Sequence, residues 1–149
     1  MIHGGFSAQG KMDLVIITKK MNSAEYKEVL GLSLIPYLEE YDDMELKFQQ
    51  ENAPIHVSGE TLEWFEEHGV DIFDHPSCSP DLNPMENLWR ILVREVYANN
   101  RQYDDVETSQ NAIFEAWDNI NDETLQNLAD SMKNRVYQVI ERGGGVTDY

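Results

Sequence analysis

Apolar residues near the N-terminus are arranged as in a β-hairpin. Two apolar segments, residues 2–7 and 12–18, flank a short polar turn, and Gly10 in that turn tolerates the positive φ that tight turns need. The run Leu14–Ile17 is continuously apolar, which is typical of a strand covered on both faces. The pattern therefore predicts a hairpin whose second strand is buried.

Two further strands are predicted in the first half of the chain. Met44, Leu46 and Phe48 alternate with polar residues, and this period of two indicates a half-buried strand over residues 44–50. A short apolar run at residues 70–73 predicts another strand.

Apolar positions spaced by three and four residues predict five helices. The first is capped by Asn22 or Ser23 and contains Gly31 and Pro36, so we expect it to be kinked or split near Ser33. The other helices are expected from Ser58 to Gly69, from Pro84 to Tyr97, from Asp104 to Asn119, and from Asn121 to Gly143–Gly145.

The last two of these helices carry apolar stripes that we expect to be buried. In the helix over residues 104–119 the stripe is Ile113, Phe114 and Trp117. In the final helix it is Leu125, Leu128, Met132, Val136, Val139 and Ile140. Strands followed by interleaved helices, with a helical C-terminal half, indicate a mixed α/β fold.

The composition fits one domain over residues 1–149. A chain of 149 residues with 41% apolar residues can fill one core. No apolar run approaches the roughly 20 residues that span a bilayer, and the N-terminus has no basic segment followed by an apolar one, so we expect no secretion signal. Cys78 is the only cysteine, which fits a reducing intracellular setting.

The net charge of −17 is the most informative bulk property. Proteins that bind nucleic acid usually neutralise phosphates with clustered Lys and Arg. Here such residues occur singly or in pairs, as in Lys19–Lys20, Arg90, Arg94, Lys133 and Arg135. The acidic balance argues against autonomous DNA binding and favours either a solvated surface or a basic partner.

Residues 79–89, Ser-Pro-Asp-Leu-Asn-Pro-Met-Glu-Asn-Leu-Trp, form a proline-containing loop that opens a helix. Asn83 is a good N-cap residue and Pro84 fits the first helical position. Glu86 then falls at the third position, where its carboxylate can close a capping box.

This segment, together with Glu51-Asn-Ala-Pro-Ile-His56 at the end of the predicted strand, resembles the catalytic core of the Tc1/mariner transposases. The family's "DNAPIH" and "SPDLNPIENLW" blocks carry the second and third acids of a DDE triad. The second block matches with Met85 for the usual Ile, whereas Glu51 stands where the family has Asp. The resemblance extends over essentially the whole chain and implies an RNase H-like fold.

The resemblance also implies which parts of the family's pattern this sequence lacks. The family's first strand and its Asp lie upstream of the hairpin that opens this chain, and no residue matches that acid. Asp13 lies on a neighbouring strand in a different register and has no family counterpart. The family's N-terminal helix-turn-helix region has no match either. We therefore expect an RNase H-like mixed sheet without its first strand. The strands beside the gap could pair directly with each other, a strand from a second copy or from another protein could fill the gap, or the chain could be a fragment of a longer product. Of these, we expect association with a partner chain.

Two-metal cleavage of phosphodiesters needs carboxylates that hold cations roughly 3.5–4 Å apart. The extra methylene of Glu51 moves its oxygens by on the order of 1 Å, which strict magnesium geometry penalises. Glu86 alone keeps a family acid, and a capping role is its structural alternative. Glu51 is either a solvated acid at a strand end or a residual metal ligand.

The remaining polar and aromatic candidates are expected to be structural. We expect His56 to be a hydrogen-bonded residue rather than a ligand, and Trp64, Trp89 and Trp117 to belong to the core. His75 and Cys78 have no second pair to complete a zinc site.

The sequence thus predicts a catalytically inactive, transposase-derived domain, truncated and adapted to another task. We expect it to form a homodimer or to bind a protein partner, to need no cofactor, and to lie in the nucleus or the cytoplasm rather than outside the cell. The alternative is a metal-dependent DNA transposase or nuclease that uses Glu51 and Glu86 with Mg²⁺ or Mn²⁺.

Overall fold

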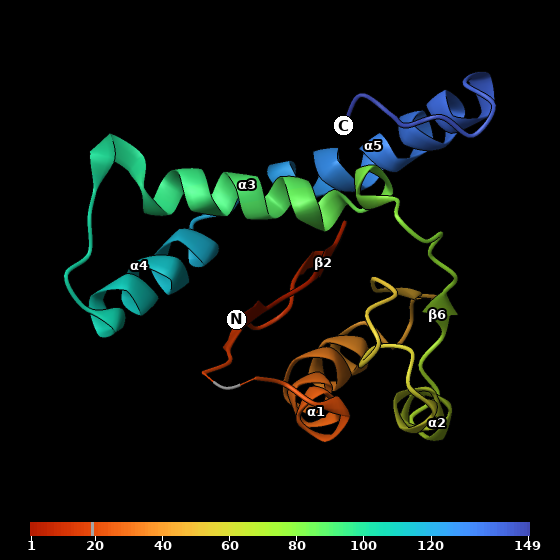
Figure 1. The fold of residues 1–149 in the computed structure, drawn as a ribbon, viewed down its shortest axis with the longest axis horizontal. Coiled ribbons are helices and arrows are strands. Elements are labelled where there is room, and N and C mark those ends of the chain that lie inside the picture. The colour runs from red at the N-terminus through yellow and green to blue at the C-terminus, as the bar shows by residue number, and fades with distance from the viewer. Residues whose placement is uncertain (19) are drawn as a thin grey trace. The chain divides into compact units, whose positions relative to one another are not determined.

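The computed structural model describes residues 1–18 and 20–149, which form two compact units (Figure 1). The first unit comprises residues 1–4 and 12–78, and the second comprises residues 5–11 and 79–149. The boundary passes through the predicted hairpin. Whether residues 1–149 behave as one domain stays a prediction.

The first unit contains two helices and two small pairs of strands. Strand β1 (Ile2–His3) pairs antiparallel with β4 (Val15–Ile16), and β5 (Phe48–Gln49) pairs parallel with β6 (Ile72–Phe73). Helix α1 (Ser23–Glu40) packs against α2 (Gly59–Glu67). The hydrophobic core of the first unit is formed mainly by one face of α1, together with residues from α2 and from the segments around the strands. Its buried members are Met12, Met21, Tyr26, Val29, Leu30, Leu34, Tyr37, Phe65 and Val70.

Two strand predictions need correction in extent. The backbone turns at residues 41–46, where the amides of Met44 and Leu46 bond to the carbonyls of Tyr41 and Met44, so β5 starts only at Phe48. In the run Leu14–Ile17 only Leu14 is fully buried. The ladder between β4 and β1 is short, and the prediction of a strand covered on both faces is wrong.

Helix α1 is continuous, so the predicted split near Ser33 is wrong. Asn22 caps it through a capping box, in which Asn22 Oδ1 accepts from the Glu25 amide at 2.9 Å and Glu25 Oε2 accepts from the Asn22 amide at 3.0 Å. Pro36 cannot donate to the carbonyl of Leu32, the residue four positions earlier, but Leu32 is 67% exposed and water can serve that oxygen. The helix therefore continues through the proline.

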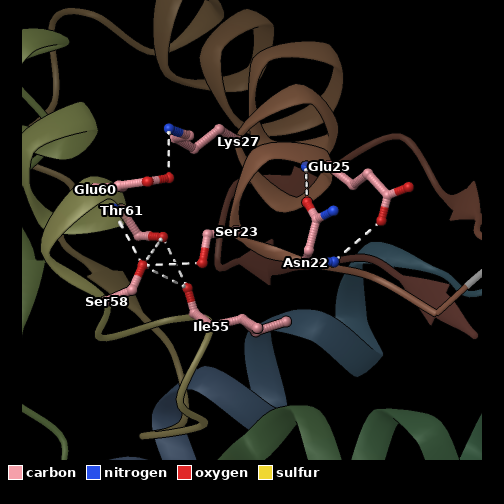
Figure 2. A network of polar contacts seen from close by, with 8 residues as sticks. All are labelled: Asn22, Ser23, Glu25, Lys27, Ile55, Ser58, Glu60 and Thr61. Carbon is pink, nitrogen blue, oxygen red and sulfur yellow. Dashed lines mark hydrogen bonds and ion pairs between the residues drawn. The ribbon is translucent and has the colours of Figure 1, made fainter.

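The first turns of α1 and α2 are joined by hydroxyl groups (Figure 2). The Ser58 hydroxyl, which caps α2, lies 3.1 Å from that of Ser23 and 2.9 Å from that of Thr61. Thr61 is completely buried and donates to the Ile55 carbonyl at 2.7 Å. The segment between β5 and α2 is therefore fixed to the start of both helices.

The second unit consists of a tight hairpin and three helices. Its strands are β2 (Phe6–Ser7) and β3 (Gly10–Lys11), which pair antiparallel. The helices are α3 (Pro84–Val96), α4 (Val106–Asp118) and α5 (Asp122–Glu141), with short 3-10 turns η1 (Pro80–Leu82) and η2 (Ala98–Asn100). Helix α3 packs against both α4 and α5 (Figure 1), and the three predicted helices of this half are confirmed.

The predicted apolar stripes are only partly buried. In α4, Trp117 is buried but Phe114 is 40% exposed. In α5, Leu125 is fully buried, whereas Val136 is 49% and Ile140 is 69% exposed. The inward position next to Val136 is occupied instead by Arg135, which is completely buried.

Arg135 is held by hydrogen bonds from every part of its guanidinium group. Its Nη1 donates to the Asp81 carbonyl at 2.7 Å, and its Nη2 donates to Asn87 Oδ1 at 3.0 Å. Its Nε donates to Ser131 Oγ at 3.0 Å, and the group lies 4.2 Å from the centre of the Tyr149 ring. Arg135 thus joins α5, the loop before α3, α3 itself and the C-terminal residues.

Lys11 ties the hairpin of the second unit to the end of α4. Its Nζ donates to the carbonyls of Trp117, Asp118 and Ile120 at 2.6, 2.9 and 2.8 Å. These oxygens lie at a helix C-terminus, where a cation is favoured by the helix dipole. Burial lowers the pKa of Lys11, an effect that the nearby Asp118 and Asp122 oppose.

No helix in the described part of the chain combines the length and the apolar character that crossing a membrane requires.

Replacing Arg135 by Met should destabilise the second unit by about 2–4 kcal/mol, because Asn87 and the Asp81 carbonyl lose a buried donor. Urea unfolding followed by circular dichroism measures this. Lys133→Met is the matched control, since Lys133 lies on the same helix and is exposed, and it should change stability by less than about 0.5 kcal/mol. Equal effects of both substitutions would contradict the role of Arg135.

Candidate functional site

Glu51 lies two residues after the end of β5, in the connection to α2, and its side chain is exposed. Its carboxylate makes no hydrogen bond or ion pair with the described residues. Its backbone is fixed, because the Glu51 carbonyl accepts a hydrogen bond from His56 Nδ1 at 2.8 Å. The position therefore combines a fixed backbone with a free carboxylate.

The preceding residue, Gln50, connects this loop to α1. Gln50 Oε1 accepts from the buried Tyr26 hydroxyl at 2.7 Å, and Gln50 Nε2 donates to the His56 carbonyl at 3.0 Å. The His56 ring stacks on the Tyr26 ring, with centroids 4.5 Å apart and an interplanar angle of 28°. The predicted hydrogen bonding of His56 is confirmed, and the expectation that it is not a ligand stays a prediction.

The residues on the other side of Glu51 are tied to the segment after β6. Asn52 Nδ2 donates to the His75 carbonyl at 2.8 Å. The side chain of His75 is 6% exposed, and its Nδ1 lies 2.9 Å from Gln49 Nε2. The side chains of Gln49, Gln50 and Asn52 all bond to other parts of the unit, so Glu51 alone presents a free side chain here.

Glu86 occupies the first turn of α3 and is partly buried. The N-cap prediction for Asn83 is confirmed, although its Oδ1 accepts from the Met85 amide at 3.1 Å. The predicted capping box is wrong, because the Asn83 amide donates to the Pro80 carbonyl at 3.0 Å and is not available to Glu86. The Glu86 carboxylate consequently has no capping role.

The loop before Glu86 is held by two groups that the sequence did not indicate. Asp81 Oδ2 accepts from the Thr147 amide at 2.7 Å, and hydrogen bonds from Thr147 hold the pKa of Asp81 below its ordinary value. Arg135 binds the Asp81 carbonyl and Asn87, the residue after Glu86. The burial of Arg135 could have been predicted from its position, because it continues the three- and four-residue spacing of Leu128, Met132 and Val139 along one helix face.

The other candidates from the sequence lie apart from these two acids or are structural. Trp117 is buried and stacks on the partly buried Trp89 with centroids 5.8 Å apart. Trp64 stacks on His68 at 4.0 Å. Asp13 and Cys78 are exposed.

The basic residues that the sequence places singly or in pairs are distributed along the chain. Arg90 and Arg94 are exposed on α3. Lys20 is exposed, whereas Lys19 lies outside the described residues.

Glu51 belongs to the first unit and Glu86 to the second. Across residues 1–18 and 20–149, no group of three or more His, Cys, Asp or Glu side chains is arranged to hold a metal ion. Within each unit, the described residues therefore do not form a donor set for a divalent cation.

Comparison with known proteins gives consistent matches. Residues 1–110 match the family described as DDE superfamily endonuclease. The chain is 42% identical over 149 residues to the Tc3 transposase of Caenorhabditis elegans, covering 100% of this chain and 45% of that protein. It is 32% identical to the Tc1 transposase of the same organism, covering 100% of this chain and 54% of that protein. The chain thus spans about half the length of these relatives.

A solved structure supports the fold. The catalytic domain of Mos1 mariner transposase superposes with a TM-score of 0.81 at 19% identity, covering 99% of this chain and 75% of that chain. This similarity shows the predicted RNase H-like, mixed α/β fold. The described strands form three separate two-stranded pairs rather than one mixed sheet, and the absence of the family's first strand stays a prediction.

His3 contains a buried ring nitrogen, Nε2, that has no hydrogen-bond partner among the described residues. Its ring meets the Tyr26 ring edge-on, with centroids 6.0 Å apart. Burial, and secondarily the charge of His56, lowers the pKa of His3 from 6.5 to about 4. The lowered pKa means that the folded chain favours the neutral form of His3 at neutral pH.

Between pH 6.5 and 4 the unfolded chain binds a proton on His3 that the folded chain does not bind. The stability due to the neutral ring is complete above about pH 6.5 and is lost as the pH falls toward 4, a loss of about 3 kcal/mol. Urea unfolding at several pH values measures it. His3→Phe keeps the ring and should reduce the pH dependence by that amount. An unchanged pH dependence in this variant would show that His3 is not responsible.

Proposed function

This chain belongs to the DDE superfamily endonuclease family and is a homologue of the Tc1/mariner transposase catalytic domain, and from this premise we propose that it acts as a catalytically inactive, transposase-derived domain that binds another protein chain. The proposal rests on one observation, the presence of Glu rather than Asp at position 51 in an otherwise matching block.

Because the backbone at Glu51 is held by hydrogen bonds, it cannot easily shift to compensate for the longer side chain of Glu. A longer side chain can be accommodated if the backbone moves back, but here the Glu51 carbonyl is bonded to His56, and Gln50 is bonded to Tyr26. The carboxylate oxygens are then displaced outward by on the order of 1 Å relative to an Asp at the same position. Magnesium coordination at short bond lengths tolerates such a shift poorly.

The acidic balance of the chain supports the same proposal. With a net charge of −17, long-range electrostatics oppose approach to DNA and favour a basic partner. We further propose a nuclear location, supported by the family resemblance, with the cytoplasm as the alternative.

Exposed apolar side chains on the C-terminal half of α5 support a role in association. Val136, Tyr137 and Ile140 are 49%, 57% and 69% exposed. Ile140 follows Tyr137 by three residues and Val136 by four, so its side chain neighbours both of theirs on the helix surface. Association with a second copy or with another protein would remove this apolar area from water.

A second candidate function is a metal-dependent DNA transposase or nuclease that uses Glu51 and Glu86. It is favoured by one observation: neither carboxylate is engaged in a structural role, since Glu86 does not close a capping box and Glu51 is exposed. Mg²⁺ or Mn²⁺ would supply Lewis-acid stabilisation of the scissile phosphate in this case.

Metal binding separates the two functions. We expect Mn²⁺ at millimolar concentration to leave the melting temperature of the parent chain unchanged and to produce no cleavage of DNA. Glu51→Asp should bring a metal-dependent rise of about 2 °C or more, the size that roughly 1 kcal/mol gives in a chain of this length. Metal-dependent cleavage by the parent chain, abolished by Glu86→Gln, would establish the enzyme instead.

Association is tested by sedimentation velocity at micromolar concentration, alone and with nuclear extract fractions. We expect a complex that is weakened by replacing Val136 and Ile140 with Ser, because this removes apolar area at the contact. Val106→Ser is the matched control, since Val106 is 72% exposed but lies on α4. A folded monomer under both conditions would contradict the proposal.

A further inference from the structure

The hydrogen bonds around Glu51 form a closed circuit within the first unit. Tyr26 donates to Gln50, Gln50 donates to the His56 carbonyl, and the His56 ring returns to the Glu51 carbonyl. We propose that Tyr26, Gln50 and His56 are positioning residues that set the direction in which the side chain of residue 51 leaves the end of β5. This inference rests on the proposed function only in treating position 51 as the family's acid position.

The His56 ring has a defined role in this circuit. A backbone carbonyl can only accept a hydrogen bond, so the Nδ1 atom that lies 2.8 Å from the Glu51 oxygen must carry the proton. A neutral His56 is then the Nδ1–H tautomer. The ring is further held flat against Tyr26 by the stack at 4.5 Å, so that both its direction and its proton are fixed.

Tyr26 anchors the circuit to the core. Its side chain is 1% exposed and lies on the buried face of α1. Burial raises the pKa of its hydroxyl, which therefore stays protonated and donates to Gln50 Oε1. That contact orients the Gln50 amide so that its nitrogen faces the His56 carbonyl at 3.0 Å. Tyr26 on α1 therefore fixes the side chain of Gln50, the residue that precedes Glu51.

The last hydrogen bond of the circuit is made to the backbone of Glu51, so the circuit orients this residue as well as stabilising the unit. It fixes the peptide group of an exposed residue whose own side chain makes no recorded contact, while the side chains on both sides bond elsewhere in the unit. Supporting hydrogen bonds of this kind fix catalytic or ligating groups within about 0.5 Å of their working geometry. Retention of this support alongside an altered acid is consistent with descent from a working site.

The first test is independent of metal. Imidazole ¹⁵N spectra of the full chain at neutral pH should show His56 as the Nδ1–H tautomer, assigned by its loss in His56→Gln. His75 is an internal comparison, because its Nδ1 faces Gln49 Nε2 and should accept, which gives the opposite tautomer. An Nε2–H tautomer at His56 would overturn the proposal.

The second test measures order at the position itself. Backbone amide order parameters of Glu51 and Asn52 should lie near ~0.85 in the parent chain and fall toward ~0.6 in His56→Gln, with a smaller fall in Tyr26→Phe, which keeps the ring stack. His68→Gln is the matched control, since His68 also bonds a backbone carbonyl through Nδ1 and stacks on an aromatic ring. Unchanged order in the first two variants, or equal changes in all three, would contradict positioning.

The same variants are then made in the Glu51→Asp background. If Glu51→Asp binds Mn²⁺, adding His56→Gln should weaken that binding by about 10- to 100-fold, and adding His68→Gln should not. If Glu51→Asp binds no Mn²⁺, the proposed basis of inactivity fails, while the tautomer and order measurements still decide whether the circuit positions residue 51. The two inferences can therefore fail separately.

Discussion

The buried guanidinium of Arg135 is the interaction on which the second unit depends. A charged group removed from water is tolerated only when its donors are satisfied, and here the partners come from four different parts of the unit. Ser131 belongs to the same helix, but Asp81, Asn87 and Tyr149 belong to the loop before α3, to α3 and to the C-terminus. Satisfying one side chain therefore specifies how the C-terminal helix, the proline-containing loop and α3 pack together.

The two family acid positions are supported in different ways. Position 86 lies on a helix whose start is fixed by the Asn83 cap and by the contacts of Arg135 with its neighbours. Position 51 lies on a connection without regular structure and is fixed by side chains from α1 and from its own loop. A helix start needs few additional contacts to be rigid, whereas a loop needs a dedicated circuit. This explains why polar side chains are so dense in residues 49–56.

Much of the fold could be predicted because its signals are local. The helix boundaries follow from capping residues and from the spacing of apolar side chains, and they lie within a few residues of the prediction. The detailed roles were less predictable, as two Asn-x-x-Glu sequences illustrate. Asn22 and Glu25 close a capping box, whereas Asn83 and Glu86 do not, because the preceding turn at Pro80 takes up the amide of Asn83. The same local motif gives two outcomes, and the choice is made by residues outside it. The burial of Arg135 was hidden for a similar reason, since its partners are distant in sequence.

The contacts of Lys11 reduce the number of positively charged side chains that remain available to bind a nucleic acid. Binding to a nucleic acid gains free energy by releasing condensed counterions, and the logarithm of affinity changes with that of salt by about 0.9 for each phosphate neutralised. The ammonium group of Lys11 already neutralises the end of α4, and the guanidinium of Arg135 is enclosed. Neither can displace a counterion from a phosphate without breaking these contacts, so the amino-acid composition overstates the positive charge that the chain can offer to a polyanion.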